Sequence, residues 1–206
     1  RLDWTTALDS NTGDLPAFSD AATLTADVEL KLSGNVALDV AGFVLASGGF
    51  TMVKRDVDVD VDGDGFADPA QTPGSPDLAD ASMMLVSLEN VNLFVGVGGV
   101  FNGDRSINTD SATGFNVAGA GLELAIVKPK APATPPATPD PTSYTGLELT
   151  VDSASLVGLE SVPITFEVTD MLVQVNKAAG PAGQAPPARL DWTTALDSNT
   201  GDLPAF

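Results

Sequence analysis

Apolar and polar residues alternate along much of this chain with a period of two, and this pattern constrains the fold more than any other feature. In residues 23–32 (TLTADVELKL) the apolar residues occupy every second position, and residues 146–152 (GLELTVD) and 164–169 (ITFEVT) repeat the arrangement. Successive side chains of a β-strand point to opposite faces, so each segment would present one apolar face and one polar face. No segment combines a helical period with helix-capping residues. The sequence therefore predicts an all-β fold.

The longer apolar segments change phase partway, so that their apolar residues move between even and odd positions. The changes fall at Gly42, at residues 48–49, 89–90 and 119–121, and at Asp170. Because a slip of one residue transfers side chains to the opposite face, each segment is predicted to be two short strands joined by a corner or a bulge. This gives roughly a dozen strands. Polar, proline-rich breaks are predicted at 57–81, 129–143 and 178–189.

Two architectures fit short, cornered strands. A tandem-repeat β-solenoid stacks such strands so that neighbouring repeats bury each other's ends. A β-sandwich repeat would also use bent strands with glycine at the bends, and it accommodates the long, unequal breaks. The cornered pattern favours the solenoid-like stack, with the sandwich as the alternative. Residues 102–111 (NGDRSINTDS) are predicted to form a hairpin loop.

Eighteen residues occur twice in the chain without a substitution. The stretch RLDWTTALDSNTGDLPAF begins at residue 1 and again at residue 189, so the copies are offset by 188 residues. Self-similarity at a fixed period is typical of tandem arrays. Residues 1–188 are therefore predicted to be one repeat unit and residues 189–206 the start of the next, an engineered duplication being the alternative. Trp4 and Leu8, or their copies Trp192 and Leu196, would then pack where successive units meet.

Charge and composition narrow the classes of function. Acidic residues number 28 against 9 basic ones, which gives a net charge of −19. Such a surface repels phosphates, so neither nucleic acid nor anionic lipid is an expected partner. Cysteine and histidine are both absent, which removes disulfides, thiolate nucleophiles and the commonest transition-metal ligand within this chain. No uncharged apolar run is long enough to predict a membrane span.

One acidic stretch has the spacing of a calcium-binding loop. In residues 60–68 (DVDGDGFAD), aspartates stand at positions 1, 3, 5 and 9, glycine at position 6, and position 7 can offer a backbone carbonyl. Ca²⁺ needs six to eight oxygen ligands, which alternate aspartates on a tight loop can supply. The predicted metal ligands are Asp60, Asp62, Asp64, Phe66 (through its backbone carbonyl) and Asp68.

The loop departs from the EF-hand pattern in one respect. Gln71 stands at position 12, where an EF-hand has a bidentate glutamate, and no helices are predicted on either side. Asp56 and Asp58 extend the acidic series and could supply a second ion. The alternative is an acidic loop that is only solvated.

The calcium-type loop resembles those of thrombospondin type 3 repeats, dockerins and integrin propellers, in which the loops are structural. The runs VALDVAGFVLASGGF, LENVNLFVGVGG, FNVAGAGLELAIV and SASLVGLESVPITFEVTDMLVQVN resemble repeat units of giant bacterial surface proteins of the haemagglutinin-like or adhesin-like kind. This resemblance covers most of the unit. It implies an extracellular, repetitive shaft at the bacterial cell surface and supplies no catalytic residue.

These observations lead to a structural hypothesis. The chain is predicted to be a calcium-stabilised repeat of an extracellular bacterial filament or surface-protein shaft, with identical units end to end as its partners. The alternative is a calcium-dependent adhesin module that binds carbohydrate or another cell surface. An enzyme is not expected, because the sequence has no nucleophile elbow, phosphate-binding loop or dinucleotide fingerprint.

Overall fold

The computed structural model describes residues 2, 4, 24–63, 77–130 and 140–196. These residues form strands and connections, with no helix among them, and none therefore builds a helix long and apolar enough to cross a membrane. The all-β prediction is confirmed. The strands are β1 (Val28–Val40), β2 (Val44–Val59), β3 (Leu78–Val97), β4 (Val100–Phe101), β5 (Ile107–Asn108), β6 (Thr113–Lys128), β7 (Ser143–Val157) and β8 (Glu167–Ala179).

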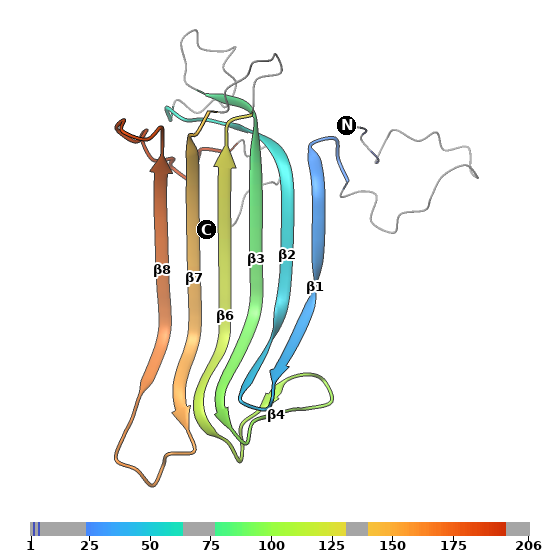
Figure 1. The fold of residues 1–206 in the computed structure, drawn as a ribbon, viewed down its shortest axis with the longest axis vertical. Coiled ribbons are helices and arrows are strands. Elements are labelled where there is room, and N and C mark those ends of the chain that lie inside the picture. The colour runs from blue at the N-terminus through green and yellow to red at the C-terminus, as the bar shows by residue number, and fades with distance from the viewer. Residues whose placement is uncertain (1, 3, 5–23, 64–76, 131–139, 197–206) are drawn as a thin grey trace, which may run out of the picture.

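Six long strands form one antiparallel sheet in the order β1-β2-β3-β6-β7-β8 (Figure 1). Neighbouring strands in the sheet follow one another along the chain, except that the short β4–β5 hairpin lies between β3 and β6. The predicted hairpin at residues 102–111 is thereby confirmed. A solenoid stack is not confirmed, since the described long strands pair side by side in a single meander.

The predicted phase changes are irregularities inside long strands or turns between them. Pairing shifts in β3 between Leu88 and Val91, where Asn90 has a positive φ of 50°. Gly119 in β6 and Asp170 in β8 also have positive φ, of 66° and 50°. At Gly42 the chain turns from β1 into β2. The described residues therefore contain eight strands, fewer than the sequence predicted, because most corners are bulges that leave the strand continuous.

The predicted breaks fall between strands, with one adjustment. The break predicted at 57–81 is shorter than expected, because β2 continues to Val59 and β3 begins at Leu78. The other two breaks follow β6, which ends at Lys128, and β8, which ends at Ala179.

The two faces of the sheet differ in chemistry. Residues that pair across antiparallel strands share a face, so the register defines rows that cross all six strands. One row is wholly apolar and the adjacent row, on the opposite face, is largely polar; we call these the apolar face and the polar face. The two rows are Leu32, Met52, Val86, Leu124, Leu147 and Val175, and Ser33, Thr51, Ser87, Glu123, Glu148 and Gln174.

Two buried clusters cover the ends of the polar face. At the lower end in Figure 1, Leu45, Phe94 and Ala112 are buried under Phe101 and Ile107 of the β4–β5 hairpin. At the upper end, the chain returns after β8 and lays residues 190–196 across the sheet, and we call these residues the returning segment. This cluster comprises Val57, Val59, Ala81, Met83, Val127 and Tyr144 of the sheet with Leu190, Ala195 and Leu196 of the returning segment.

Candidate metal centre

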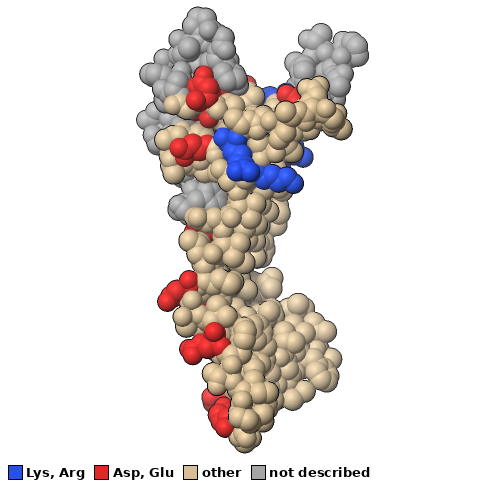
Figure 2. All heavy atoms as spheres, turned by 90° about the vertical axis from the view of Figure 1, so that its left-hand side faces the viewer, with Lys and Arg blue, Asp and Glu red and all other residues tan. Residues whose placement is uncertain are grey.

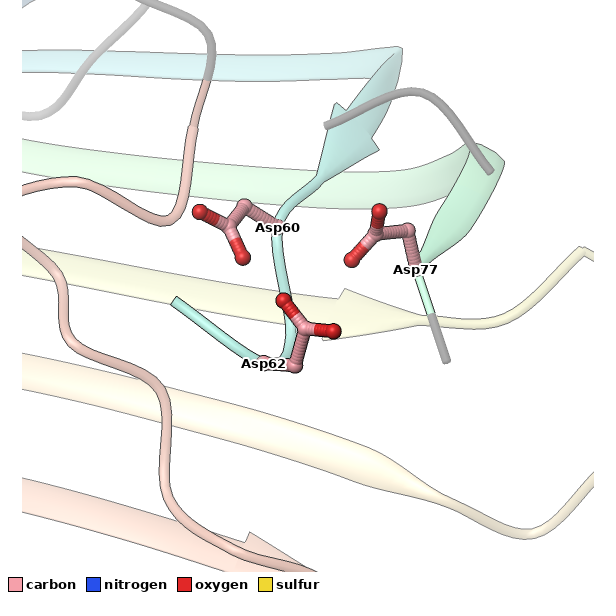
Figure 3. A group of neighbouring side chains, drawn as sticks. All are labelled: Asp60, Asp62 and Asp77. Carbon is pink, nitrogen blue, oxygen red and sulfur yellow. The ribbon is translucent and has the colours of Figure 1, made fainter. Parts of the chain in front are cut away.

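Three aspartates meet at the upper edge of the sheet, where β2 ends and β3 begins. Asp60 directly follows β2 and Asp77 directly precedes β3. Because the two strands are antiparallel neighbours, the end of one lies beside the start of the next. Asp62 lies just beyond Asp60, and one carboxylate oxygen from each aspartate lies within 4.8 Å of the other two (Figure 3).

Backbone hydrogen bonds orient two of these carboxylates. The Gly63 N–H donates to Asp60 Oδ1 at 2.6 Å, and the Val61 N–H donates to Asp77 Oδ1 at 3.1 Å. Gly63 has a φ of +80°, a left-handed conformation that glycine adopts without a steric penalty. The turn after β2 thus brings the Asp60 and Asp62 carboxylates close to that of Asp77 (Figure 3).

The burial of two of the three aspartates makes the trio a candidate for binding a cation. Only 3% of Asp60 and 9% of Asp77 are exposed, while Asp62 is exposed to solvent. Three carboxylates this close repel one another, and burying charge without compensation is costly. A hard cation bound by oxygen ligands would remove both penalties. The three aspartates can therefore hold a metal ion, and their all-oxygen chemistry suits Ca²⁺ or Mg²⁺ rather than a soft transition metal.

The structure brings together two of the predicted ligands. Asp60 and Asp62 belong to the trio, whereas Asp64, Phe66 and Asp68 lie outside the described residues, and their role as ligands stays a prediction.

The aspartates proposed for a second ion contact other groups. Asp56 lies 3.3 Å from the Lys130 ammonium, and Asp58 Oδ1 accepts a hydrogen bond of 2.7 Å from the Asp80 N–H. Neither belongs to the trio, and the second-ion hypothesis stays a prediction.

Sequence reasoning missed Asp77, the third member of the trio. It lies well beyond the recognised loop spacing, so no motif connects it to Asp60. One signal was present: Asp77 lies inside the predicted break at 57–81 but directly precedes LADASMM, in which Ala79, Ala81 and Met83 alternate with Asp80 and Ser82. Had β2 and β3 been recognised as antiparallel neighbours, Asp77 would have been placed at the same sheet edge as Asp60.

The returning segment contacts the candidate metal centre directly. The Asp60 N–H donates to the Ala195 carbonyl at 2.8 Å, and Leu196 forms a β-bridge with Val59. Leu190, Ala195 and Leu196 are nearly fully buried. The centre and the returning segment therefore form one continuous assembly over the ends of β2 and β3.

Side-chain contacts specify how the returning segment lies on the sheet. Asn176 of β8 donates from Nδ2 to the Leu190 carbonyl at 2.8 Å and accepts from the Trp192 indole N–H at 3.2 Å. The indole covers Gly146 of β7 so closely that a Cβ there would lie 2.7 Å from Trp192 Cε2. A glycine in β7 and an asparagine in β8 thus provide a binding position for this tryptophan.

A turn at Asp191 shapes the returning segment. Asp191 Oδ1 accepts hydrogen bonds from the Thr193 hydroxyl at 2.6 Å and the Thr193 N–H at 3.0 Å. These bonds favour the ionised carboxylate, so the pKa of Asp191 lies below its ordinary value. The Asp191 carbonyl also accepts from the Ala195 N–H at 2.8 Å, which closes the turn.

The polar face has a shallow hollow that bears on the predicted carbohydrate ligand. Glu89, Glu123, Glu148 and Asp152 contribute to its lining, which contains no aromatic residue. Ser87 donates to Glu123, and Gln174 donates to Glu148 at 2.7 Å. A surface that binds sugars by stacking needs an aromatic platform, which this lining does not provide.

Comparison with known proteins gave no match among family models, curated proteins or solved structures.

Proposed function

We propose that this chain is a structural repeat of an extracellular bacterial filament or surface-protein shaft, in which the start of each unit completes the core of the unit before it. One observation carries the proposal. Residues 190–196 pack into the core of a sheet built from residues 28–179, and the same residues recur 188 positions earlier as residues 2–8.

The two copies differ in the environment of an equivalent leucine. Leu190 is 2% exposed, whereas Leu2 is 60% exposed. Because the copies are identical in sequence, residues 2–8 can make on a preceding unit the contacts that residues 190–196 make here. An array built this way buries every copy except the first.

Ca²⁺ is the ion proposed for the trio of Asp60, Asp62 and Asp77. The trio is anionic and all-oxygen, and the neighbouring loop offers the predicted further ligands Asp64, Phe66 and Asp68. Since the Asp60 N–H also donates to the Ala195 carbonyl, an ion bound there would stabilise the returning segment. Calcium would thereby stiffen the connection between units.

Of the two predicted architectures, we propose the β-sandwich repeat. A solenoid would coil its strands around an enclosed core, whereas here one meander presents a continuous apolar face to its surroundings.

Electron microscopy of three consecutive 188-residue units in Ca²⁺ tests the proposed function. We expect straight rods whose length increases in equal steps when units are added. The matched variant carries Leu→Asp at each internal equivalent of Leu190, and it should show globules joined by flexible connections. Wild-type units that already appear as freely jointed globules would contradict the proposal.

A further inference from the structure

The apolar face is the largest feature of the sheet that the candidate metal centre does not explain. Besides the row that contains Leu124, two further rows cross all six strands on this face. They are Gly34, Phe50, Leu88, Leu122, Leu149 and Val173, and Leu38, Ala46, Leu93, Val117, Ala154 and Val168. Every position in the three rows is apolar or glycine, and on β1 the face extends from Leu32 to the end of the strand at Val40.

In the part of the chain that the structure describes, this face is open along its edge strands, and the Leu124 row is partly exposed on the four central strands. Leu32 and Leu38 on β1 are each 50% exposed, and Val175 on β8 is 44% exposed. Both buried clusters of described residues lie on the polar face. Phe166 packs near the lower end of the apolar face, where its ring lies 5.8 Å from that of Phe115.

The size of the open face matches that of a stable protein interface. Six strands about 4.8 Å apart, followed over nine residues at about 3.3 Å each, cover roughly 850 Å². Soluble monomers rarely expose apolar patches beyond a few hundred Å², whereas a standard interface buries about 800 Å² on each partner. The face is therefore large enough to form an interface and too large to be left in water.

We propose that the apolar face is covered by the apolar face of a second copy, so that two six-stranded sheets pack into a β-sandwich. Two such faces pack about 10 Å apart with interdigitating side chains, and they need no polar partner because the three rows contain no polar side chain. A two-fold axis makes the surface its own partner.

Charge distribution supports the same partner. Acidic side chains line one margin of the molecule when it is viewed from the β8 side, and the opposite margin of its lower half carries none (Figure 2). Glu123 and Glu148 lie on the polar face, so face-to-face pairing leaves them in solvent. Two chains that each carry a net charge of −19 can thus associate without burying like charges against one another.

This inference goes beyond the proposed function, because it concerns lateral pairing of sheets and requires neither calcium nor the junction at residues 190–196. The molar mass of the full chain in solution gives the first test. One chain has a mass of 21.0 kDa, and we expect twice that value by light scattering at micromolar concentration.

Paired substitutions on β1 and β8 identify the face responsible. Leu32→Lys with Val175→Lys charges the apolar face at positions that a lone sheet leaves about half exposed, so the variant should fold and become a monomer. Ser33→Lys with Gln174→Lys adds equal charge to exposed positions on the polar face and should remain a dimer. Circular dichroism verifies that both variants fold.

Thiol labelling gives a second readout in a chain that has no native cysteine. Val175→Cys should react with a maleimide at least tenfold more slowly than Gln174→Cys if the apolar faces are paired. A monomeric wild type in which both thiols react equally fast would overturn the proposal. So would a monomer that binds phosphatidylcholine vesicles through Val175, or a dimer that the polar-face variant dissociates and the apolar-face variant does not.

Discussion

Leu190 and Leu2 occupy equivalent positions in two identical stretches of sequence, yet one is buried beneath the sheet's upper end and the other is 60% exposed. The difference lies in what surrounds each residue rather than in the local sequence. Leu190 follows a complete sheet that offers Asn176, Gly146 and the buried ends of β2 and β3, and Leu2 precedes that sheet. In this chain the copy at residues 190–196 packs into the core of the sheet that precedes it, which is the observation behind the proposal that each repeated segment completes the unit before it.

The largest expected effect comes from truncating the two leucines separately. Leu190→Ala removes a buried side chain and should lower the free energy of unfolding by about 2–5 kcal/mol. Leu2→Ala, the matched control, should change it by less than about 0.5 kcal/mol, as is usual for exposed positions. Urea denaturation measures both. If both substitutions lower the free energy of unfolding equally, the two leucines do not differ in their contribution to stability, and the comparison fails.

A second test fills the space that Trp192 needs. Gly146→Ala places a methyl group where the Trp192 ring lies and should cost about 1–3 kcal/mol, as overpacking usually does. The displaced indole should also show red-shifted fluorescence. Gly103→Ala is the control, because a Cβ added there, in the β4–β5 hairpin, would meet nothing within 4 Å. If the two substitutions lower the free energy of unfolding equally little, the packing of Trp192 does not depend on Gly146.

Calcium should stabilise the docked copy in particular, since Asp60 of the candidate centre donates to the Ala195 carbonyl of the returning segment. At a concentration of one hundred times Kd, Ca²⁺ should stabilise the fold by about 2.7 kcal/mol, and EDTA should reverse the effect. Calorimetry with and without metal measures the shift.

Two variants locate the calcium effect. Asp77→Asn keeps an acceptor for the Val61 N–H but removes a charge, so the response should weaken; Asp62→Ala with Asp64→Ala should abolish it. Asp110→Asn, in an exposed loop, is the control. A full calcium response in the Asp77 variant would place the ion elsewhere.

The smallest effect concerns pH. The pKa of Asp191 is lowered by hydrogen bonds from Thr193, so ionised Asp191 contributes stability that is present above its unfolded pKa of about 3.9. This contribution is lost as pH falls through the lower, folded pKa. When the pH falls below about 4, the melting temperature of Asp191→Asn should therefore decrease less than that of the wild type. Thermal melts at a series of pH values measure this difference. Parallel curves for the two proteins would contradict the assignment.

Local features of the fold could be predicted from the sequence, and pairings between distant segments could not. Alternation identified the strands, and its interruptions located the irregularities at Asn90, Gly119 and Asp170, because a bulge disturbs only its own neighbourhood. The choice between a stack and a single meander depends on which strands pair, as Leu93 does with Val117. A period of two does not encode that choice.

The candidate site likewise has one part that the sequence predicted and one part that it did not. Asp60 and Asp62 were predictable, since the calcium-loop spacing is a property of consecutive residues. Asp77 joins them only because β2 and β3 are antiparallel neighbours. The burial of Leu196 against Val59 likewise depends on a contact between residues far apart in the chain, which no local pattern records.

The most direct measurement is the thermal unfolding of residues 1–188, alone and with the free peptide RLDWTTALDSNTGDLPAF. Without residues 189–206 the upper end of the sheet loses its cover, so the melting temperature should fall below that of the full chain. The peptide added in excess should raise it again, and a scrambled peptide should not. A truncated chain that melts at the same temperature as the full one, with no response to the peptide, would contradict the claim that each unit is completed by the start of the next.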